Sequence, residues 1–236
     1  MKSIIIKNVS KKFYIGTKSS RILGKEQKKE FLALKNINLE LKTGEKIGII
    51  GKNGAGKSTL LRIIAGIYQK DSGTLETNGK LISVLGLNIG LQERLSVKDN
   101  IFLFCTLYKL TKNQINQKLK TILKFAELER YENTKLYQLS DGMKVRLISA
   151  ISLHANSDII LLDDVDMILD KKFVQKATKK HIELSRKGTT VIIVTHNLDL
   201  LKHCHKVLWM DNGEIKAIGE NKEIVKSYLK DIKKNS

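Results

Sequence analysis

A glycine-rich segment at residues 51–59, Gly-Lys-Asn-Gly-Ala-Gly-Lys-Ser-Thr, has the residue types and spacing needed to hold the phosphates of a nucleotide. Its glycines let the backbone aim successive N–H groups at phosphate oxygens, Lys57 can reach the β- and γ-phosphates, and the Ser58 hydroxyl can bind Mg²⁺. The segment lies between a strand-type apolar run at 46–50 and a helix-type run at 60–66, which disfavours an incidental glycine-rich turn. The residues expected to contact the nucleotide here are Gly51, Asn53, Gly54, Ala55, Gly56, Lys57, Ser58 and Thr59.

Two further apolar strand-type runs end in residues that can act on phosphates. Residues 159–162 lead into Asp163 and Asp164, and residues 190–195 lead into His196. Asp163, at a strand end beside the phosphate loop, can hold Mg²⁺ directly or through water, and Asp164 can face an attacking water. His196 could reach the γ-phosphate from the end of its own strand. The alternatives are a solvated strand end for the acids and a satisfied buried side chain for the histidine.

Two adjacent aromatic residues, Phe13 and Tyr14, follow the first apolar segment. Either ring could stack on the purine of a nucleotide. The alternative is that both rings cover the edge of the core, because aromatic side chains are large apolar groups first. The sequence leaves open both the role of the pair and the choice of ring.

A second helix start that could bind an anion lies at residues 139–144, Leu-Ser-Asp-Gly-Met-Lys. Ser140 supplies a hydroxyl, Gly142 a flexible backbone, and the helix N-terminus a positive potential. Read alone, Ser140 is an ordinary N-cap. A role in binding an anion is indicated only when this segment is considered together with the other motifs.

Composition narrows the class of protein but not its partner. The chain has 236 residues, 42% of them hydrophobic, and a formal net charge of +19. Two cysteines are too few for a disulfide framework, which fits a reducing cytosol. We expect no membrane-spanning segment, because no apolar run is long enough. The charge favours a polyanion, either nucleic acid or an anionic membrane surface, or it reflects a lysine-rich solvated surface. Charge alone does not choose among the three.

The order of the apolar patterns predicts an α/β fold in one large domain, residues 1–236. We expect an edge strand at 3–9, a loop or short exposed helix at 16–31, and a hairpin or meander through residues 37–41 into the strand before the phosphate loop. A mostly helical subdomain is expected from about 90 to about 155. Strand, helix and strand then alternate, which predicts right-handed crossovers and a doubly wound sheet. The later elements are expected at 159–164, 172–186, 190–195, 207–210, 214–218 and 222–230.

Taken together, these motifs resemble the ATP-binding-cassette (ABC) ATPases over essentially the whole chain. Residues 137–146, Tyr-Gln-Leu-Ser-Asp-Gly-Met-Lys-Val-Arg, are similar to the signature Tyr-Ser-Ser-Gly-Met-x-x-Arg of teichoic-acid, capsule and O-antigen export ATPases. Residues 163–170, Asp-Asp-Val-Asp-Met-Ile-Leu-Asp, are similar to that group's Asp-Glu-Val-x-x-Val-Gly-Asp. Residues 208–213 and 224–228 resemble its closing strand and its ending.

The resemblance implies a P-loop NTPase with a mixed sheet core, an N-terminal antiparallel β subdomain and an inserted α-helical subdomain. It implies the ATP-binding and hydrolysing subunit of an ABC exporter, with ATP and Mg²⁺ as cofactors and a lipid-linked polysaccharide or teichoic-acid-like polymer as cargo. The expected partners are an integral membrane permease subunit and a second copy of this chain, bound in the presence of ATP, with no direct nucleic acid. The expected location is peripheral, at the cytoplasmic face of the plasma membrane.

The resemblance also implies roles for residues to which spacing alone assigns none. Ser140 and Gly142 of one copy would complete the phosphate site of the other, with Met143 and Asp170 beside them. The glutamine that couples Mg²⁺ to the membrane partner in the family is best matched by Gln92, as a metal ligand and catalytic residue, although a frame shifted to Asn88 is possible.

Three positions depart from the family pattern. Asp164 stands where the family has a catalytic glutamate, Asp141 replaces a small residue, and Leu169 replaces a glycine. Asp164 keeps open a slow-turnover, nucleotide-gated regulatory module, and the charge of +19 keeps open a non-transport ABC ATPase acting on nucleic acid or the ribosome.

Overall fold

A six-stranded sheet forms the centre of the computed structural model, which describes residues 1–16, 28–86 and 90–234. Its strand order is β5-β6-β7-β3-β8-β9, with β5 to β8 parallel and β9 antiparallel to β8. The bounds are Lys46–Ile50 (β3), Leu81–Val84 (β5), Ile159–Asp163 (β6), Thr190–Val194 (β7), Lys206–Asp211 (β8) and Glu214–Gly219 (β9). Every residue of β3 and β7 is buried, as expected for parallel strands covered on both faces.

A three-stranded antiparallel sheet packs beside it, in the order β2-β1-β4. Its strands are Lys2–Gly16 (β1), Lys28–Lys42 (β2) and Ser72–Thr77 (β4). The edge strand predicted at 3–9 is therefore wrong, because β1 pairs with β2 on one side and β4 on the other. The local pattern shows which face of a strand is buried, whereas its neighbours are set by contacts distant in sequence.

Two further expectations in this region need correction. Residues 28–31 of the predicted loop belong to β2, and residues 17–27 lie outside the described part of the chain. The predicted hairpin from residues 37–41 into β3 is also wrong, because β2 pairs with β1 while β3 lies in the other sheet. The turn at 43–45 therefore carries the chain between two sheets rather than within one.

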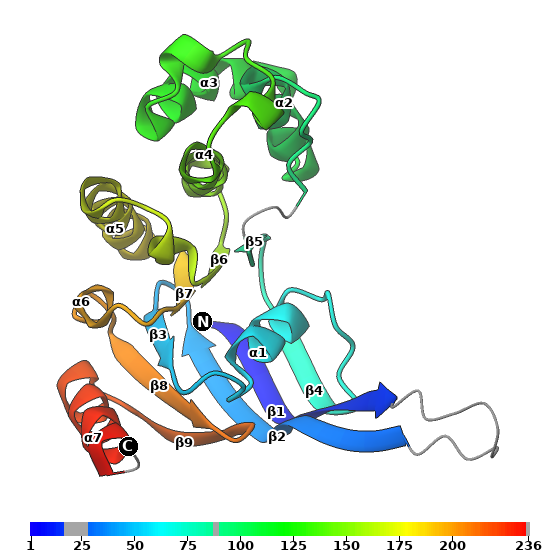
Figure 1. Cartoon of the computed structure of the whole chain (residues 1–236), viewed down its shortest axis with the longest axis vertical. Helices are drawn as coiled ribbons and strands as arrows, with labels where there is room; N and C mark the ends of the chain where they lie inside the picture. The colour runs from blue at the N-terminus through cyan, green and yellow to red at the C-terminus, as the bar shows by residue number, and fades with distance from the viewer. Residues whose placement is uncertain (17–27, 87–89, 235–236) are drawn as a thin grey trace.

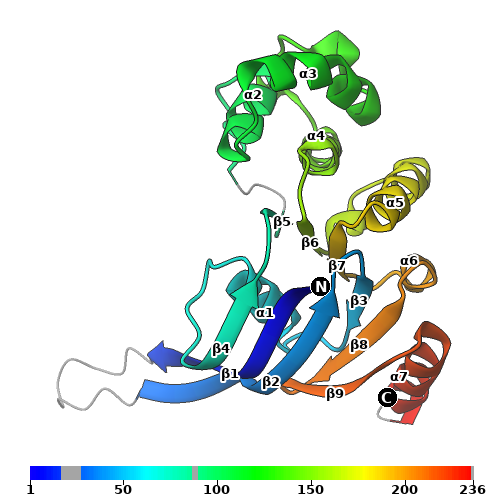
Figure 2. The same ribbon diagram turned by 180° about the vertical axis from the view of Figure 1, so that it is seen from behind.

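Helices cover the central sheet and extend away from it. The helices next to the sheet include Lys57–Ile64 (α1), Lys171–Arg186 (α5), Leu198–Leu201 (α6) and Asn221–Lys234 (α7). Val97–Leu107 (α2), Lys112–Ala126 (α3) and Asp141–His154 (α4) follow β5 and precede β6. Both views place α2 and α3 at the opposite end of the molecule from α7 (Figures 1 and 2). The division into a subdomain at about 90–155 remains a prediction, although helices fill that interval.

Helix starts in this interval are fixed by local hydrogen bonds. A capping box joins Thr111 to Gln114 at the start of α3, since the Thr111 hydroxyl accepts from the Gln114 N–H and the Gln114 side chain accepts from the Thr111 N–H. A second capping box joins Ser96 to Asp99 at the start of α2. Within the described residues, no helix combines the length and hydrophobicity needed to cross a bilayer.

Candidate active site

The phosphate loop connects β3 to α1 and has a conformation that requires glycine. Gly54 and Gly56 have φ values of +80° and +98°, in the left-handed region. A Cβ on Gly56 would lie 2.7 Å from the Ala33 carbonyl oxygen, so there is no room for a side chain there. Gly56 is also the N-cap of α1 and provides no side-chain cap, which leaves the first helical N–H groups available to an anion.

Lys57 lies folded against this loop. Its Nζ donates to the carbonyl oxygens of Gly51, at 2.8 Å, and Lys52, at 3.0 Å, and the residue is only 6% exposed. Burial lowers the pKa of Lys57, and the nearby carboxylates of Asp164 and Asp163 oppose that shift. The loop thus holds a cation whose favourable partners would be negatively charged phosphate oxygens.

The two adjacent acids lie where the sheet topology predicts. Strand β6 ends at Asp163, which pairs with Val194 of β7, and β7 in turn pairs with the strand that leads into the loop. Asp163 Oδ1 is buried, and none of the described residues provides it with a hydrogen bond. A buried carboxylate oxygen without a donor is costly, so it is suited to a cation. This observation supports a magnesium ligand at Asp163.

Asp164 adopts a left-handed backbone conformation, with φ 49°. Its N–H donates to the Val194 carbonyl oxygen at 3.0 Å, and its side chain lines the same cavity as Lys57. His196 Nε2 lies 4.0 Å from Asp164 Oδ2. The structure therefore brings together two candidate catalytic residues that are far apart in the sequence.

A cavity of about 270 Å³ lies over the loop. It is lined by residues 53–59 of the loop, Asp164 and, from the antiparallel sheet, Phe13, Phe31 and Ala33. Phe13 and Phe31 are partners across the β1–β2 pairing. A flat group bound beside the phosphates would meet these rings, which is the chemistry expected for a nucleotide base.

The structure separates the two aromatic candidates. Consecutive strand residues point to opposite faces, so Tyr14 faces away from the cavity lined by Phe13 and is 64% exposed. Phe13 also contacts the Tyr68 ring edge-on, with centroids 5.5 Å apart. The geometry favours Phe13 as the base-stacking residue. Phe31 was missed, because its place opposite Phe13 follows from strand register and not from a local motif.

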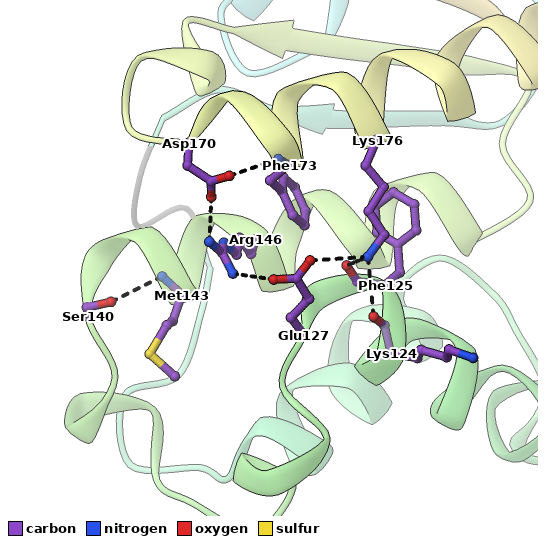
Figure 3. A network of polar contacts seen from close by, with 9 residues as sticks. All are labelled: Lys124, Phe125, Glu127, Ser140, Met143, Arg146, Asp170, Phe173 and Lys176. Carbon is purple, nitrogen blue, oxygen red and sulfur yellow. Dashed lines mark hydrogen bonds and ion pairs between the residues drawn. The ribbon is translucent and has the colours of Figure 1, made fainter.

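The signature segment begins α4 and does not contact the cavity of its own chain. Ser140 is exposed and caps the helix, with its Oγ accepting from the Met143 N–H at 3.3 Å (Figure 3). Gly142 lies in the first turn, where the nearest atom to an added Cβ would be the Ile168 carbonyl oxygen at 3.8 Å. None of the described residues lining the loop cavity comes from α4. The predicted role of Ser140, Gly142 and Met143 at the nucleotide of a second copy remains a prediction.

Asp170 is occupied as the N-cap of α5. Its Oδ1 accepts from the Phe173 N–H at 3.0 Å, and its Oδ2 accepts from the guanidinium of Arg146 (Figure 3). The Phe173 N–H and then the Arg146 guanidinium hold the pKa of Asp170 below its usual range. Asp170 is absent from the described residues that line the loop cavity, so its predicted nucleotide contact remains a prediction.

Gln92 lies just before α2. Its backbone N–H donates to Asn100 Oδ1 at 2.8 Å, and its side-chain Nε2 donates to the Gly90 carbonyl oxygen at 3.3 Å. Gln92 is not among the described residues that line the loop cavity, and Asn88 lies outside the described part of the chain. Its role in coupling remains a prediction.

Comparison with known proteins decides the family. The family model described as ABC transporter matches residues 34–166, which is more than half of the chain. The chain belongs to the ABC transporter family. It is 38% identical to a teichoic acids export ATP-binding protein, TagH, of Lactococcus lactis over 90% of this chain and 46% of the relative. It is 32% identical to the O-antigen export system ATP-binding protein RfbB of Klebsiella pneumoniae over 85% of this chain and 82% of the relative.

Solved ABC structures agree with the fold. The dimeric ATP-binding cassette MJ0796, in a post-hydrolysis state with ADP and Pi, matches with a TM-score of 0.80 and 27% identity over 92% of this chain and 98% of the other. The chain carries the ABC ATPase cassette, and the predicted α/β fold and likeness to polymer-export ATPases are confirmed. It spans 46% of the Lactococcus relative and 64% of the TagH protein of Shouchella clausii, to which it is 35% identical.

Proposed function

We propose that this ABC cassette is the ATP-hydrolysing subunit of an exporter that drives a lipid-linked polysaccharide or teichoic-acid-like polymer across the cytoplasmic membrane. The ATPase part of this proposal rests on the convergence of Lys57, Asp163 and Asp164 at the phosphate loop. Asp163 Oδ1 is buried there and has no hydrogen-bond partner among the described residues. The polymer part is supported by the names of the relatives, which are teichoic-acid and O-antigen export proteins.

The residues present fit ATP and Mg²⁺. The N–H groups of the loop and Lys57 would hold the phosphates, and Phe13 would contact the base. Ser58 and Asp163 would hold Mg²⁺, with Gln92 as a further ligand in the family arrangement, and the ion supplies positive charge to the phosphates. Asp164 orients the water and accepts its proton, while His196 contacts the γ-phosphate or holds Asp164 in place.

The site is incomplete in one copy. The exposed N-terminus of α4, with Ser140 and Gly142, would cover the phosphates of a second copy, and Met143 and Asp170 would lie at the same interface. The description of MJ0796 as a dimeric cassette supports this arrangement. A membrane permease subunit would carry the polymer, which places this chain peripherally on the cytoplasmic face of the membrane.

Depletion and replacement of the chain in its own cells test this proposal. Depletion should cause lipid-linked polymer to accumulate inside the cell, and wild-type chain should restore export. Lys57→Ala should fail to restore export, whereas Lys70→Ala, which removes an exposed lysine outside the cavity, should succeed. Normal export without the chain would disprove the transport role, and Mg²⁺-dependent ATPase activity measured in parallel would show whether the catalytic assignment survives.

A further inference from the structure

A polar network outside the loop cavity joins the end of α3, the signature helix α4 and the start of α5 (Figure 3). Its charged members are Glu127, Arg146, Asp170 and Lys176. Glu127 is the C-cap of α3, and Arg146 lies on α4. Asp170 is the N-cap of α5, and Lys176 lies within that helix. The contacts within this cluster form without a nucleotide. We therefore relate the cluster to the relative positions of the three helices.

Arg146 lies between two carboxylates. Its Nη1 donates to Glu127 Oε2 at 2.9 Å, and its Nη2 donates to Asp170 Oδ2. The guanidinium also lies over the Phe173 ring, 5.5 Å from the centroid. A planar guanidinium held from two directions and stacked on a ring has little rotational freedom. Arg146 thereby fixes α4 to the first turn of α5.

Lys176 joins α5 to the C-terminus of α3. Its Nζ donates to the Phe125 carbonyl oxygen at 2.9 Å and lies 3.5 Å from Glu127 Oε1. A cation at this position satisfies a terminal helix carbonyl and complements the helix dipole. The rings of Phe125 and Phe173 also meet edge-on, with their centroids 5.6 Å apart. The apolar contact holds the two helices together, while the charged groups set their register.

Glu127 is the residue that links the two cations, and it does so from an unfavourable backbone conformation. Its φ is 60°, in the left-handed region where helices most often end in glycine. Each of its two carboxylate oxygens contacts a different cation, Oε2 with Arg146 and Oε1 with Lys176. A glycine would fit the backbone better and would lose both contacts. The contacts with the two cations are therefore what the Glu127 side chain provides at this helix end.

We propose that Glu127 is a positioning residue for the composite ATP site. By holding Arg146 and Lys176 together, it fixes the angle between α4 and α5, and hence the spacing between Ser140 and Asp170 at the two helix starts. This inference rests on the proposed function, because these two helix starts act only if they face the nucleotide of a second copy. A displacement of about 1 Å there would reduce turnover without affecting the loop that first binds ATP.

Glu127→Gly and Glu127→Gln separate this role from a purely structural one. Glycine removes the carboxylate but relieves the left-handed backbone, so thermal stability should be maintained or raised. Glutamine keeps the length and removes the charge. Glu132→Gln is the matched control, because it breaks an ion pair with Lys98, at 3.3 Å, outside the network. The full chain, solubilised in detergent from its own cell membranes, is the material.

Both Glu127 variants should lower kcat about tenfold while the Kd for ATP stays within about twofold of the wild-type value. Glu132→Gln should match the wild type in both. Wild-type kcat in Glu127→Gly would overturn the positioning role, and so would a loss of activity that merely follows a lower melting temperature. An inactive wild type would instead overturn the proposed function, so the two failures are distinguishable.

Discussion

The imidazole of His196 lies 4.0 Å from the carboxylate of Asp164, although the two residues follow the ends of different strands. The approach follows from the pairing of β6 with β7, which places their carboxyl ends side by side. Strand β3 pairs with β7 on its other side, so the phosphate loop begins at the same edge. Three strand ends thus bring the glycine-rich loop, two acids and a histidine to one edge of the sheet, which is where ligands bind in sheets of this kind.

The first prediction concerns Lys57. Replacing it with alanine removes the positive charge held at the loop, so we expect ATPase activity to fall more than about a hundredfold. The fold should survive, because the hydrogen bonds that Lys57 Nζ donates among the described residues go to loop carbonyl oxygens and the side chain lines the cavity. Steady-state phosphate release and circular dichroism measure the two effects. Normal ATP affinity and turnover in Lys57→Ala would show that the phosphate site lies elsewhere.

The second prediction compares the two adjacent aromatic residues. Phe13→Ala should weaken ATP binding about tenfold, because stacking of a base on an aromatic ring contributes about 1–3 kcal/mol. Tyr14→Ala should change affinity little, since Tyr14 does not line the cavity that Phe13 lines. Binding of a fluorescent ATP analogue to both variants provides the comparison. Equal losses in both, or a larger loss in Tyr14→Ala, would contradict the assignment.

Local sequence was sufficient to predict the turn at the glycine-rich loop and the place of the two acids at a strand end. Residues 51–59 specify a turn, a cation and a helix start within one short segment, and Asp163 follows directly from a buried strand. Such features depend on neighbours in the chain, so their spacing is visible in the sequence. The same holds for the capping box at Thr111.

Features set by strand pairing could not be predicted in this way. The central place of β1 and the position of Phe31 opposite Phe13 depend on register between strands. Alternation of apolar residues fixes a face and leaves the partner strand undetermined. The contact of Glu127 with Arg146 and Lys176 was missed for the same reason, because it joins three helices that are separate in the sequence.

The third prediction concerns His181, a buried residue of α5. Burial, together with the positive charge of nearby Lys46, lowers the pKa of His181 from 6.5 to about 3. The unfolded chain therefore binds this proton at a higher pH than the folded chain does. The stabilising contribution of neutral His181 is complete above about pH 6.5 and is lost as the pH falls toward 3.

Urea unfolding between pH 6 and pH 4 measures this effect. His181 should contribute a slope of about 1.4 kcal/mol per pH unit to the free energy of unfolding, and His181→Gln should lack that contribution. NMR titration of the His181 ring in the wild type is an independent check that does not depend on a variant. A ring that becomes protonated above pH 5 in the folded protein would contradict the prediction.

The last prediction concerns the length of the Asp164 side chain, the proposed catalytic carboxylate. Asp164 stands where the export ATPases that the sequence resembles have glutamate, and it is one methylene shorter, roughly 1.5 Å of reach. The backbone offers little compensation, because the Asp164 N–H is bonded to the Val194 carbonyl oxygen and φ is 49°. A misplacement of about 1 Å at a reacting centre can reduce the rate about a hundredfold. We therefore expect the wild-type protein to bind ATP normally and to hydrolyse it slowly.

Asp164→Glu should raise kcat with little change in ATP affinity, because only the placement of the attacking water in the transition state is altered. Asp164→Asn should lower kcat further, since an amide cannot accept the proton, and it should retain the ATP-bound dimer, which light scattering would detect. Single-turnover kinetics with both variants separates binding from chemistry. If Asp164→Glu leaves kcat unchanged or lowers it, then the strand end already places the shorter acid correctly, or His196, 4.0 Å away, carries the chemistry.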